Sequence, residues 1–111
     1  MAKFEVKKEK DGQYYFHLKA NNGEIILASE MYKSKSSSAN GIESLKKHAP
    51  DDKRYEKKDT KNGQFMFNLK AANHQVIGTS ESHTTTKARD NGIASVKKNA
   101  PGATVNDQTA H

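Results

Sequence analysis

The chain has 111 residues, a formal net charge of +6 and no cysteine, which excludes disulfides and thiolate zinc sites. Only 17 residues are Leu, Ile, Val or Phe, and such a low apolar content together with high net charge is typical of disordered chains. No apolar run approaches the roughly 18–20 residues of a membrane span, and the first residues lack the apolar segment of a secretory signal, so we expect a cytoplasmic protein.

Three strands are predicted in the first thirty residues. Apolar residues alternate with polar ones at 4–6 and again at 14–20. Asp11-Gly12 between these runs predicts a type I′ hairpin turn, because both residues tolerate a positive φ. Asn21-Asn22-Gly23 predicts a second turn before a short strand at 24–28.

A helix is predicted next, with Ser34 as its N-cap and Pro50 just beyond its end. Ser38, Ile42, Leu45 and Ala49 are spaced to share one face. Gly41 lies mid-helix, which costs roughly 1 kcal/mol relative to Ala. Close packing of the helix on the sheet is a sufficient reason for a glycine there.

The rest of the chain repeats the first part with a shift of 51 residues. Between 4–50 and 55–101, 21 of 47 aligned positions are identical without a gap, which indicates a tandem duplication. We place repeat one at 1–51 and repeat two at 52–111. A unit near 50 residues buries little surface by itself, so we expect the two repeats to share one core.

The second repeat carries the same predicted elements in the same order. Strands are predicted at 52–59, 65–71 and 75–79, a helix is predicted from the N-cap Thr85 to the residue before Pro101, and a last short strand at 103–107. His74 stands where the first repeat has Gly23, so a different turn geometry is expected there. The order βββα-βββα-β favours an α+β fold with helices on one face of the sheet.

Several motifs together resemble the YegP-like family of uncharacterised bacterial proteins. They are Asp11-Gly12 before Tyr14-Tyr15-Phe16-His17-Leu18-Lys19-Ala20, then Asn22-Gly23-Glu24, Ser29-Glu30 and Asn40-Gly41-Ile42-Glu43-Ser44-Leu45-Lys46-Lys47. The second repeat departs from them at His74 and has Ser82-His83 in place of Met31-Tyr32.

This resemblance implies β(3)-α-β units that pair into a single, largely antiparallel sheet with exchanged C-terminal strands. In this chain it implies that the strand at Arg54–Asp59 joins the copies and that the strand at Ala103–Asp107 closes the sheet. The family carries no established activity, so the resemblance implies a fold and leaves the function open.

No catalytic or metal-binding pattern stands out. None of the five histidines, His17, His48, His74, His83 and His111, faces another histidine in the repeat alignment, and no clustered metal-ligand spacing is present. Ser29-Glu30 and Ser80-Glu81 are duplicated, but neighbours on a strand point to opposite faces, so they do not form a nucleophile and base. We therefore expect no enzyme activity, no catalytic residues, no metal and no cofactor.

The basic charge favours polyanion binding as one function. The uncovered sheet face is expected to present Tyr15, His17 and Lys19, with Met66, Asn68 and Lys70 from the other repeat. Aromatic and cationic side chains on a sheet loosely resemble platforms for single-stranded nucleic acid. With only two arginines, any such binding is expected to be weak and sequence-non-specific.

The leading hypothesis is a binding or accessory module with an unidentified ligand or protein partner. Sheet edges can accept a peptide strand, and a seam between the helices is expected to expose the duplicated Asn40 and Asn91. Ser38, Gly41, Gly92 and Arg89 are expected to line the same seam. Arg89 could take an anion there or extend its charged end from the helix edge into solvent. We expect a monomer with internal pseudo-twofold symmetry, because the duplication satisfies strand pairing internally. No membrane partner is expected, because no apolar run is long enough to span a membrane.

Overall fold

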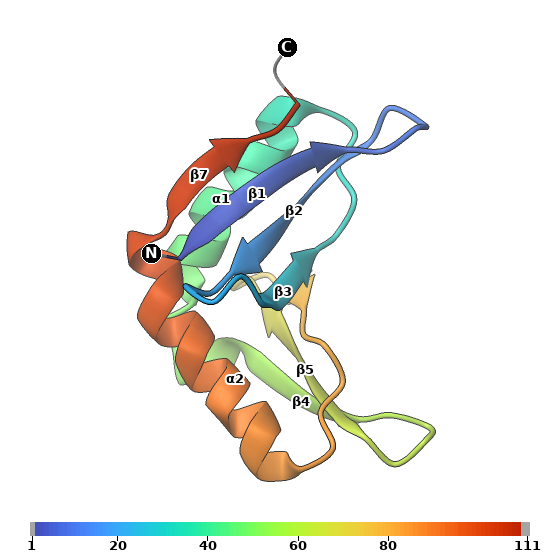
Figure 1. The fold of residues 1–111 in the computed structure, drawn as a ribbon, viewed down its shortest axis with the longest axis vertical. Helices are drawn as coiled ribbons and strands as arrows, with labels where there is room; N and C mark the ends of the chain where they lie inside the picture. Colours follow the sequence, from blue (N-terminus) through green and yellow to red (C-terminus); the bar gives the residue numbers. More distant parts are fainter. Residues whose placement is uncertain (1, 110–111) are drawn as a thin grey trace.

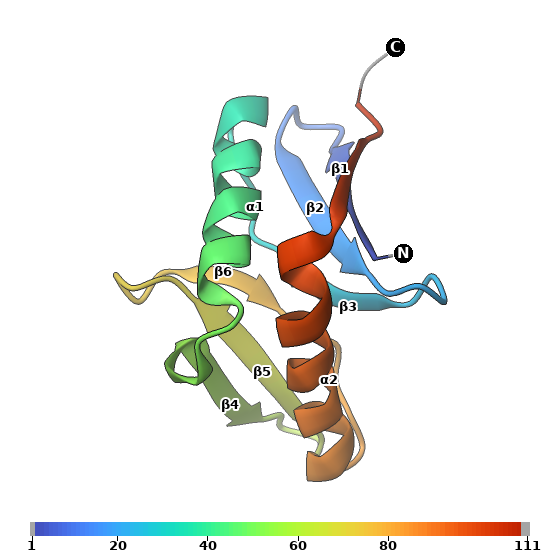
Figure 2. The ribbon, with the colours of Figure 1, turned by 90° about the vertical axis from the view of Figure 1, so that its left-hand side faces the viewer.

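The computed structural model describes residues 2–109, so Met1, Ala110 and His111 lie outside the described residues. Repeat one forms β1 (Lys3–Lys8), β2 (Tyr14–Lys19), β3 (Ile25–Ser29) and α1 (Lys35–His48). Repeat two forms η1 (Asp52–Arg54), β4 (Tyr55–Asp59), β5 (Phe65–Lys70), β6 (Val76–Thr79) and α2 (Thr86–Asn99), followed by η2 (Ala100–Gly102) and β7 (Thr104–Asp107). The strands build one seven-stranded sheet, and both helices cover the same face of it (Figure 1, Figure 2). The predicted α+β class is confirmed.

The helices begin where the capping residues predict. The Ser34 hydroxyl accepts from the Ser37 amide at 3.1 Å, and the Thr85 hydroxyl accepts from the Ala88 amide at 3.0 Å. Each hydroxyl satisfies one of the amides that the first turn of a helix leaves free. Within residues 2–109, neither helix is long and apolar enough to cross a membrane.

The two halves of the sheet meet at β3 and β6, which pair antiparallel through Ala28 with Thr79 and Ser29 with Gly78. The strand order is β4-β5-β6-β3-β2-β1-β7. The expectation that the strand at Arg54–Asp59 joins the copies is therefore wrong. In a three-stranded meander the first strand lies farthest from the third, so pairing of the two third strands leaves β4 at the outer edge of the sheet.

That strand also begins later than residue 52, where it was predicted to begin. The Asp51 carboxylate accepts from the Lys53 amide at 3.0 Å, and this cap turns Asp52–Arg54 into η1 before the chain extends at Tyr55.

The last strand, β7, belongs to repeat two but pairs in parallel with β1 of repeat one. The Gln108 amide donates to the Val6 carbonyl at 2.9 Å. Asp107 forms an ion pair with Lys35 of α1, and hydrogen bonds from Lys35 and Thr109 lower the pKa of Asp107 to about 2. The exchange of the C-terminal strand that the family resemblance implies is therefore present. Strand β7 closes the edge of the sheet at β1.

Buried side chains from both repeats form one hydrophobic cluster between the sheet and the helices. Its large, nearly inaccessible members are Phe4, Phe16, Phe67, Leu18, Leu27, Leu45, Leu69 and Val96. Helix α1 contacts β6 of repeat two, and α2 contacts β3 of repeat one. Each helix therefore packs partly on the other repeat.

The tight hairpin turns are not of type I′. Gly12 has a φ of 88° and Gly63 a φ of 80°, but neither Asp11 nor Asn62 has a positive φ. The Gly12 amide donates to the Glu9 carbonyl at 3.0 Å, and the Glu9 amide donates to the Gln13 carbonyl at 2.8 Å. These bonds define a three-residue loop that ends in a left-handed glycine, the other common hairpin connection.

The second pair of turns shares one geometry despite the exchange of Gly23 for His74. Gly23 has a φ of 84° and His74 a φ of 70°. Their amides donate to the Ala20 and Ala71 carbonyls, each at 2.9 Å. The expected difference in turn geometry is wrong, because the closing hydrogen bonds hold His74 in the left-handed region.

Replacing His74 with glycine should therefore stabilise the protein by about 1 kcal/mol, since a side chain at positive φ is strained. Urea unfolding followed by circular dichroism measures the change. His74→Ala is the matched control and should bring no gain, because its Cβ keeps the strain. Equal stabilisation by both substitutions would show that the imidazole, rather than the backbone, is unfavourable.

Candidate functional site

The sheet face that the helices leave uncovered carries the predicted Tyr15, His17 and Lys19 in one row on β2. The Tyr15 and His17 rings meet edge to face with centroids 5.2 Å apart. Lys70 lies on β5, and β3 and β6 separate that strand from β2. Three strand spacings amount to roughly 14 Å, so the structure does not bring Lys70 next to the other three residues.

Two glutamates that the sequence analysis did not single out form ion pairs with Lys3, Lys19 and Lys70 on this face. Lys19 Nζ lies 2.8 Å from Glu5, and Lys3 Nζ lies 3.3 Å from the same carboxylate. In repeat two, Lys70 Nζ lies 3.0 Å from Glu56. A signal for these pairs exists in the sequence, because the glutamate and the lysine recur together in both repeats. The ion pairs reduce the charge available to a polyanion.

Hydrogen bonds lower the pKa of both glutamates. For Glu5 the bond from Lys19 outweighs the opposing effect of burial. For Glu56 the bonds from Lys70 and Asn68 act in the same direction. Both carboxylates are therefore charged at neutral pH, and both ion pairs are present there.

His17 does not add positive charge at neutral pH. Burial, and then the nearby Lys7 and Lys19, lower the pKa of His17 below its ordinary value of 6.5. Its Nδ1 is buried without a hydrogen-bond partner among residues 2–109. The ring is thus an aromatic surface beside Tyr15 rather than a cation.

Asn40 and Asn91 lie in two equivalent grooves, each formed by a helix of one repeat and a turn of the other. The α1 groove has a volume of about 710 Å³ and is lined by Glu30, Tyr32, Ser37, Asn40, Gly41, Ser44, Ala71, Asn73, Gln75, Val76 and Ile77. The α2 groove has a volume of about 440 Å³ and is lined by Ala20, Asn21, Asn22, Asn91, Ala94, Ser95, Lys98 and Asn99. Both asparagines are exposed.

The two asparagines do not share a seam, and neither do the other residues expected there. Ser38 is buried, and its hydroxyl donates to the Lys35 carbonyl at 2.7 Å. A Cβ at Gly41 would clash with Tyr32 Oη, and one at Gly92 would lie 3.2 Å from Phe67 Cε1. The glycines face the sheet and its flanking aromatic rings instead of each other, because each helix needs a close approach to the core beneath it.

Arg89 is buried rather than extended into solvent from the helix edge. Only 9% of its surface is exposed, its guanidinium lies 5.7 Å from the centre of the Phe65 ring, and its Nε lies 3.3 Å from Asp90. The guanidinium of Arg89 thus already has a carboxylate beside it within its own chain.

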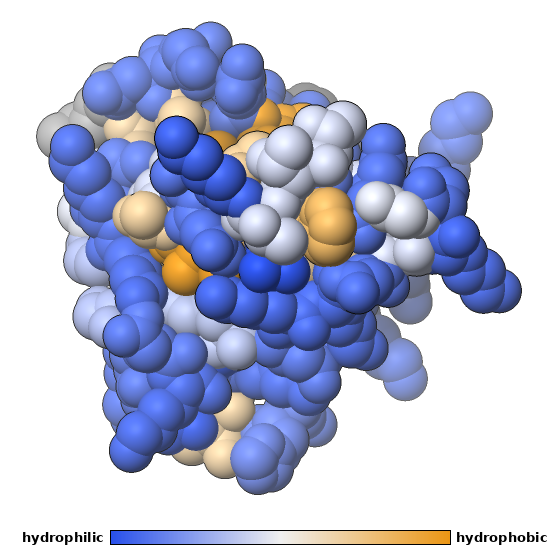
Figure 3. Space-filling model, turned by 90° about the horizontal axis from the view of Figure 1, so that it is seen from below, coloured by the Kyte–Doolittle hydropathy of each residue, from blue (hydrophilic) through white to orange (hydrophobic). Residues whose placement is uncertain are grey.

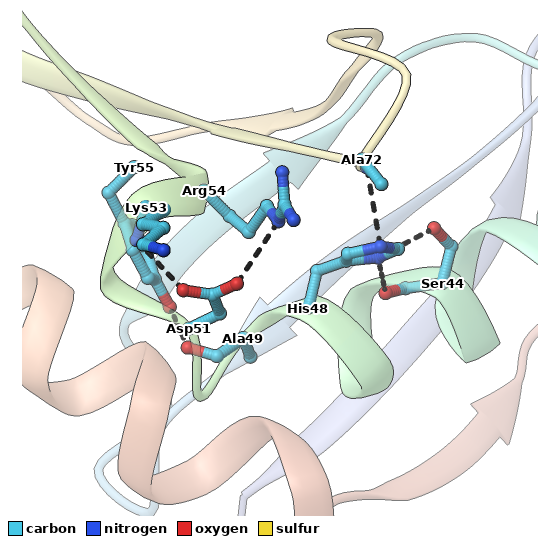
Figure 4. Close-up of polar contacts among 8 residues, drawn as sticks. All are labelled: Ser44, His48, Ala49, Asp51, Lys53, Arg54, Tyr55 and Ala72. Atoms are coloured by element: carbon cyan, nitrogen blue, oxygen red, sulfur yellow. Dashed lines mark hydrogen bonds and ion pairs between the residues drawn. The ribbon is translucent and has the colours of Figure 1, made fainter.

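His48 connects α1 to the turn that forms one wall of the α1 groove (Figure 4). Its Nδ1 lies 2.8 Å from the Ser44 carbonyl, and the Ala72 amide donates to its Nε2 at 3.3 Å. This geometry requires the tautomer with the proton on Nδ1. The counterpart of His48, Asn99, instead donates to Ser95 at 3.1 Å.

Figure 4 also shows the chain after α1, where Tyr55 and Asp51 make polar contacts. The Tyr55 hydroxyl donates to the Ala49 carbonyl at 2.7 Å, and burial raises the pKa of this hydroxyl. Asp51 lies 3.2 Å from Arg54 Nε. These contacts fix the entry into β4.

The duplicated serines have structural partners. The Ser29 hydroxyl accepts from the Phe16 amide at 2.8 Å and donates to the Glu30 carbonyl at 2.8 Å. The Ser80 hydroxyl makes the same pair of bonds with Phe67 and Glu81. Both hydroxyls hold the turn after a strand. In the described part of the chain, no three His, Asp or Glu side chains lie close enough to hold a metal ion.

A family model described as a domain of unknown function, DUF1508, matches residues 9–56 and again residues 60–107. The chain belongs to the DUF1508 family. The two DUF1508 matches begin 51 residues apart, the same shift that aligns the repeats.

Proteins similar to this DUF1508 chain confirm the YegP-like resemblance. This chain is 59% identical over 102 residues to the UPF0339 protein in ptx operon 5'region of Stutzerimonas stutzeri, and the match covers 92% of each chain. This chain is also 54% identical over 106 residues to the UPF0339 protein YegP of Escherichia coli K12, and that match covers 96% of each chain.

Two solution NMR structures share the fold of this DUF1508 protein. The structure of E. coli yegP, described as a protein of unknown function, has a TM-score of 0.93 and 52% identity, over 99% of this chain and 95% of that one. The structure of a UPF0339 protein from Shewanella oneidensis has a TM-score of 0.91 and 50% identity, over 96% of this chain and 90% of that one. The homologues are uncharacterised proteins.

Proposed function

We propose that this DUF1508 protein is a non-catalytic binding module that takes a small polar ligand in the α1 groove. One observation carries the proposal: the groove presents the exposed amide of Asn40 opposite the turn of the other repeat. The volume of about 710 Å³ falls within the range of small-molecule sites. We further propose that the protein acts as a monomer, since the duplication supplies both halves of the sheet, and that it acts in the cytoplasm.

The α1 groove suits a ligand better than the α2 groove does, because it combines a polar rim with apolar walls. Asn73 and Gln75 lie on the turn side, and Val76 and Ile77 supply apolar surface. The bonded hydroxyls of the duplicated serines support the non-catalytic part of the proposal, because neither is available as a nucleophile without breaking a turn.

An NMR titration of the ¹⁵N-labelled chain with a panel of amino acids, sugars and nucleosides tests the proposal. We expect at least one compound to shift the amides of Asn40, Asn73 and Gln75. Asn40→Ala should weaken that binding by about fivefold, the value of one hydrogen bond. Asn91→Ala is the matched control and should leave binding unchanged. A panel that leaves these amides unshifted, or equal effects of the two substitutions, would contradict the proposal.

The alternative is weak, sequence-non-specific nucleic-acid binding through the sheet face. It has less support, because Lys19 and Lys70 are already paired with carboxylates. A titration with single-stranded oligonucleotides at two salt concentrations distinguishes the two functions. Shifts of the Tyr15 and His17 amides that disappear as salt rises would favour nucleic acid, since phosphate binding weakens through counterion release.

A further inference from the structure

The two edges of the sheet differ, although the repeats are alike. At one edge β7 covers β1, and at the other, among residues 2–109, no strand pairs with the outer side of β4. Figure 1 shows β7 and β4 at opposite ends of the molecule. The duplicated fold therefore has two equivalent edges and one strand to cover them.

The groove that β7 borders in repeat one has an equivalent in repeat two. In repeat one, β1 and α1 present Val6, Ala39 and Ile42 beside Val105 of β7. The equivalent positions are Lys57, Asp90 and Ile93, which with Asp52, Tyr55, Ala94 and Lys97 line the β4 groove of about 470 Å³. The helix and the edge strand thus form this groove in both repeats.

The backbone of β4 has the geometry to receive a parallel strand. In repeat one the Val6 carbonyl accepts from Gln108 at 2.9 Å, so the peptide groups of Val6 point toward β7. Lys57 is the counterpart of Val6 and pairs with Phe67 in the register that matches Val6 with Phe16. Its peptide N–H and C=O accordingly point away from β5, toward the open edge.

We propose that the β4 edge binds an extended segment of a partner protein as a parallel eighth strand, with an apolar residue over Ile93 and Ala94 and an acidic residue two positions later. Val105 and Asp107 of β7 show this spacing in repeat one, where Asp107 pairs with Lys35. In repeat two Thr86 stands at the position of Lys35, and the positive charge beside the acidic residue comes from Lys57, the counterpart of the Val6 that pairs with Asp107. Lys97, which packs on the Tyr55 ring, adds a second positive charge to the β4 groove.

These two lysines can change partners at little cost. Lys57 lies 3.3 Å from Asp90, and both side chains are about half exposed. Lys97 pairs with Asp52, which is largely exposed. Exposed ion pairs contribute little to stability, so the carboxylate of a bound strand can displace either aspartate.

A second copy of this chain fits the edge less well than a foreign segment does. In a twofold antiparallel pairing centred on Lys57, the two Lys57 side chains would stand opposite each other, and like charges in that position are unfavourable. Figure 3 views the molecule from the end that carries β4 and shows mostly hydrophilic surface with small hydrophobic areas. Such a surface suits a peptide strand more than a stable apolar dimer interface.

The experiment titrates the ¹⁵N-labelled full chain with a capped synthetic peptide of residues 102–109, the β7 sequence. We expect the amides of Glu56–Lys58 and Ile93–Lys97 to shift. A peptide N-methylated at the residue equivalent to Gln108 should bind at least tenfold more weakly, about the value of one or two lost hydrogen bonds. The matched control is N-methylated at the residue equivalent to Asp107, whose N–H points away, and should bind like the parent peptide.

A protein variant gives an independent measurement. The Lys57→Pro variant lacks the outward N–H and should bind the parent peptide at least about tenfold more weakly than the wild-type chain does. The affinity of Lys57→Ala should stay within about threefold of the wild-type value. The proposal fails if the β4 amides do not shift, if shifts are confined to β1 and α1, or if both N-methylated peptides bind equally. Shifts of the β4 amides that depend on protein concentration without peptide would show that a second copy binds there, and would also overturn it.

Discussion

Lys19→Met is expected to lower the free energy of unfolding by about 2 kcal/mol at neutral pH, because it leaves the buried Glu5 carboxylate with a weaker set of partners. Only 6% of the Glu5 side chain is exposed, and Lys19 Nζ lies 2.8 Å from it. Lys3 remains at 3.3 Å, which limits the loss. Urea unfolding measures the effect.

Lys70→Met is the matched control, since the same pair exists in repeat two with Glu56. There 37% of the glutamate side chain is exposed, so water replaces the lost lysine and we expect a much smaller change. The difference arises at the edges of the sheet, because β7 places Asn106 beside Glu5, whereas no strand of the described chain lies beside Glu56 on the outer side of β4. Equal losses in both repeats would show that burial of Glu5 does not contribute.

The Glu5 pair also makes stability depend on pH. Because folding lowers the pKa of Glu5 below its ordinary value of 4.5, the stabilisation is fully present above pH 4.5 and is lost as the pH falls through the lowered pKa. We expect acid to destabilise the wild-type chain more steeply than Lys19→Met in this range. Parallel curves would contradict this assignment of the pair.

Gly78→Ala is expected to destabilise the protein by about 1–3 kcal/mol through overpacking at the junction of the repeats. A Cβ at Gly78 would lie 2.8 Å from Leu27 Cγ and Cδ2, and 3.2 Å from the Ala28 carbonyl oxygen. Leu27 is only 1% exposed, and the carbonyl belongs to β3, so neither can move freely. Thermal or urea unfolding measures the loss.

Gly102→Ala is the matched control for this prediction. A Cβ there would have no atom within 4 Å, and the residue has no positive φ, so we expect no loss. The double variant Gly78→Ala/Leu27→Val tests the cause. Shortening Leu27 makes room for the new methyl group, so the two changes should destabilise less together than the sum of their separate effects.

Much of the fold was predictable because it depends on local signals that occur twice. Ser34 and Thr85 as N-caps, and the alternating apolar residues of the strands, act within a few residues of the chain. The tight turns were predicted in place but not in type, because Asp11 and Gly12 are compatible with two hairpin connections. His74 misled the prediction because hydrogen bonds that close the turn override the backbone preference of one residue.

The candidate site was predicted only in part, because its grooves lie between the repeats. Asn40 is exposed as a helix surface residue should be, but the wall opposite it comes from residues 71–77 of the other repeat. No spacing within one repeat indicates that contact. Arg89 was expected at a seam between the helices. Its burial over the Phe65 ring depends on tertiary packing, which local sequence patterns do not indicate.

The amino-acid sequence by itself determined the duplication, the order of the elements and the composition of the core. These follow from periodicity and capping, which are local properties. Low apolar content proved compatible with folding because both repeats contribute to one hydrophobic cluster. Only the tertiary structure decided which strands pair across the repeats, and therefore which edge is covered and which charges are buried. Pairing of β3 with β6, and of β7 with β1, joins residues far apart in the chain, so no local pattern distinguishes these pairings from the alternatives.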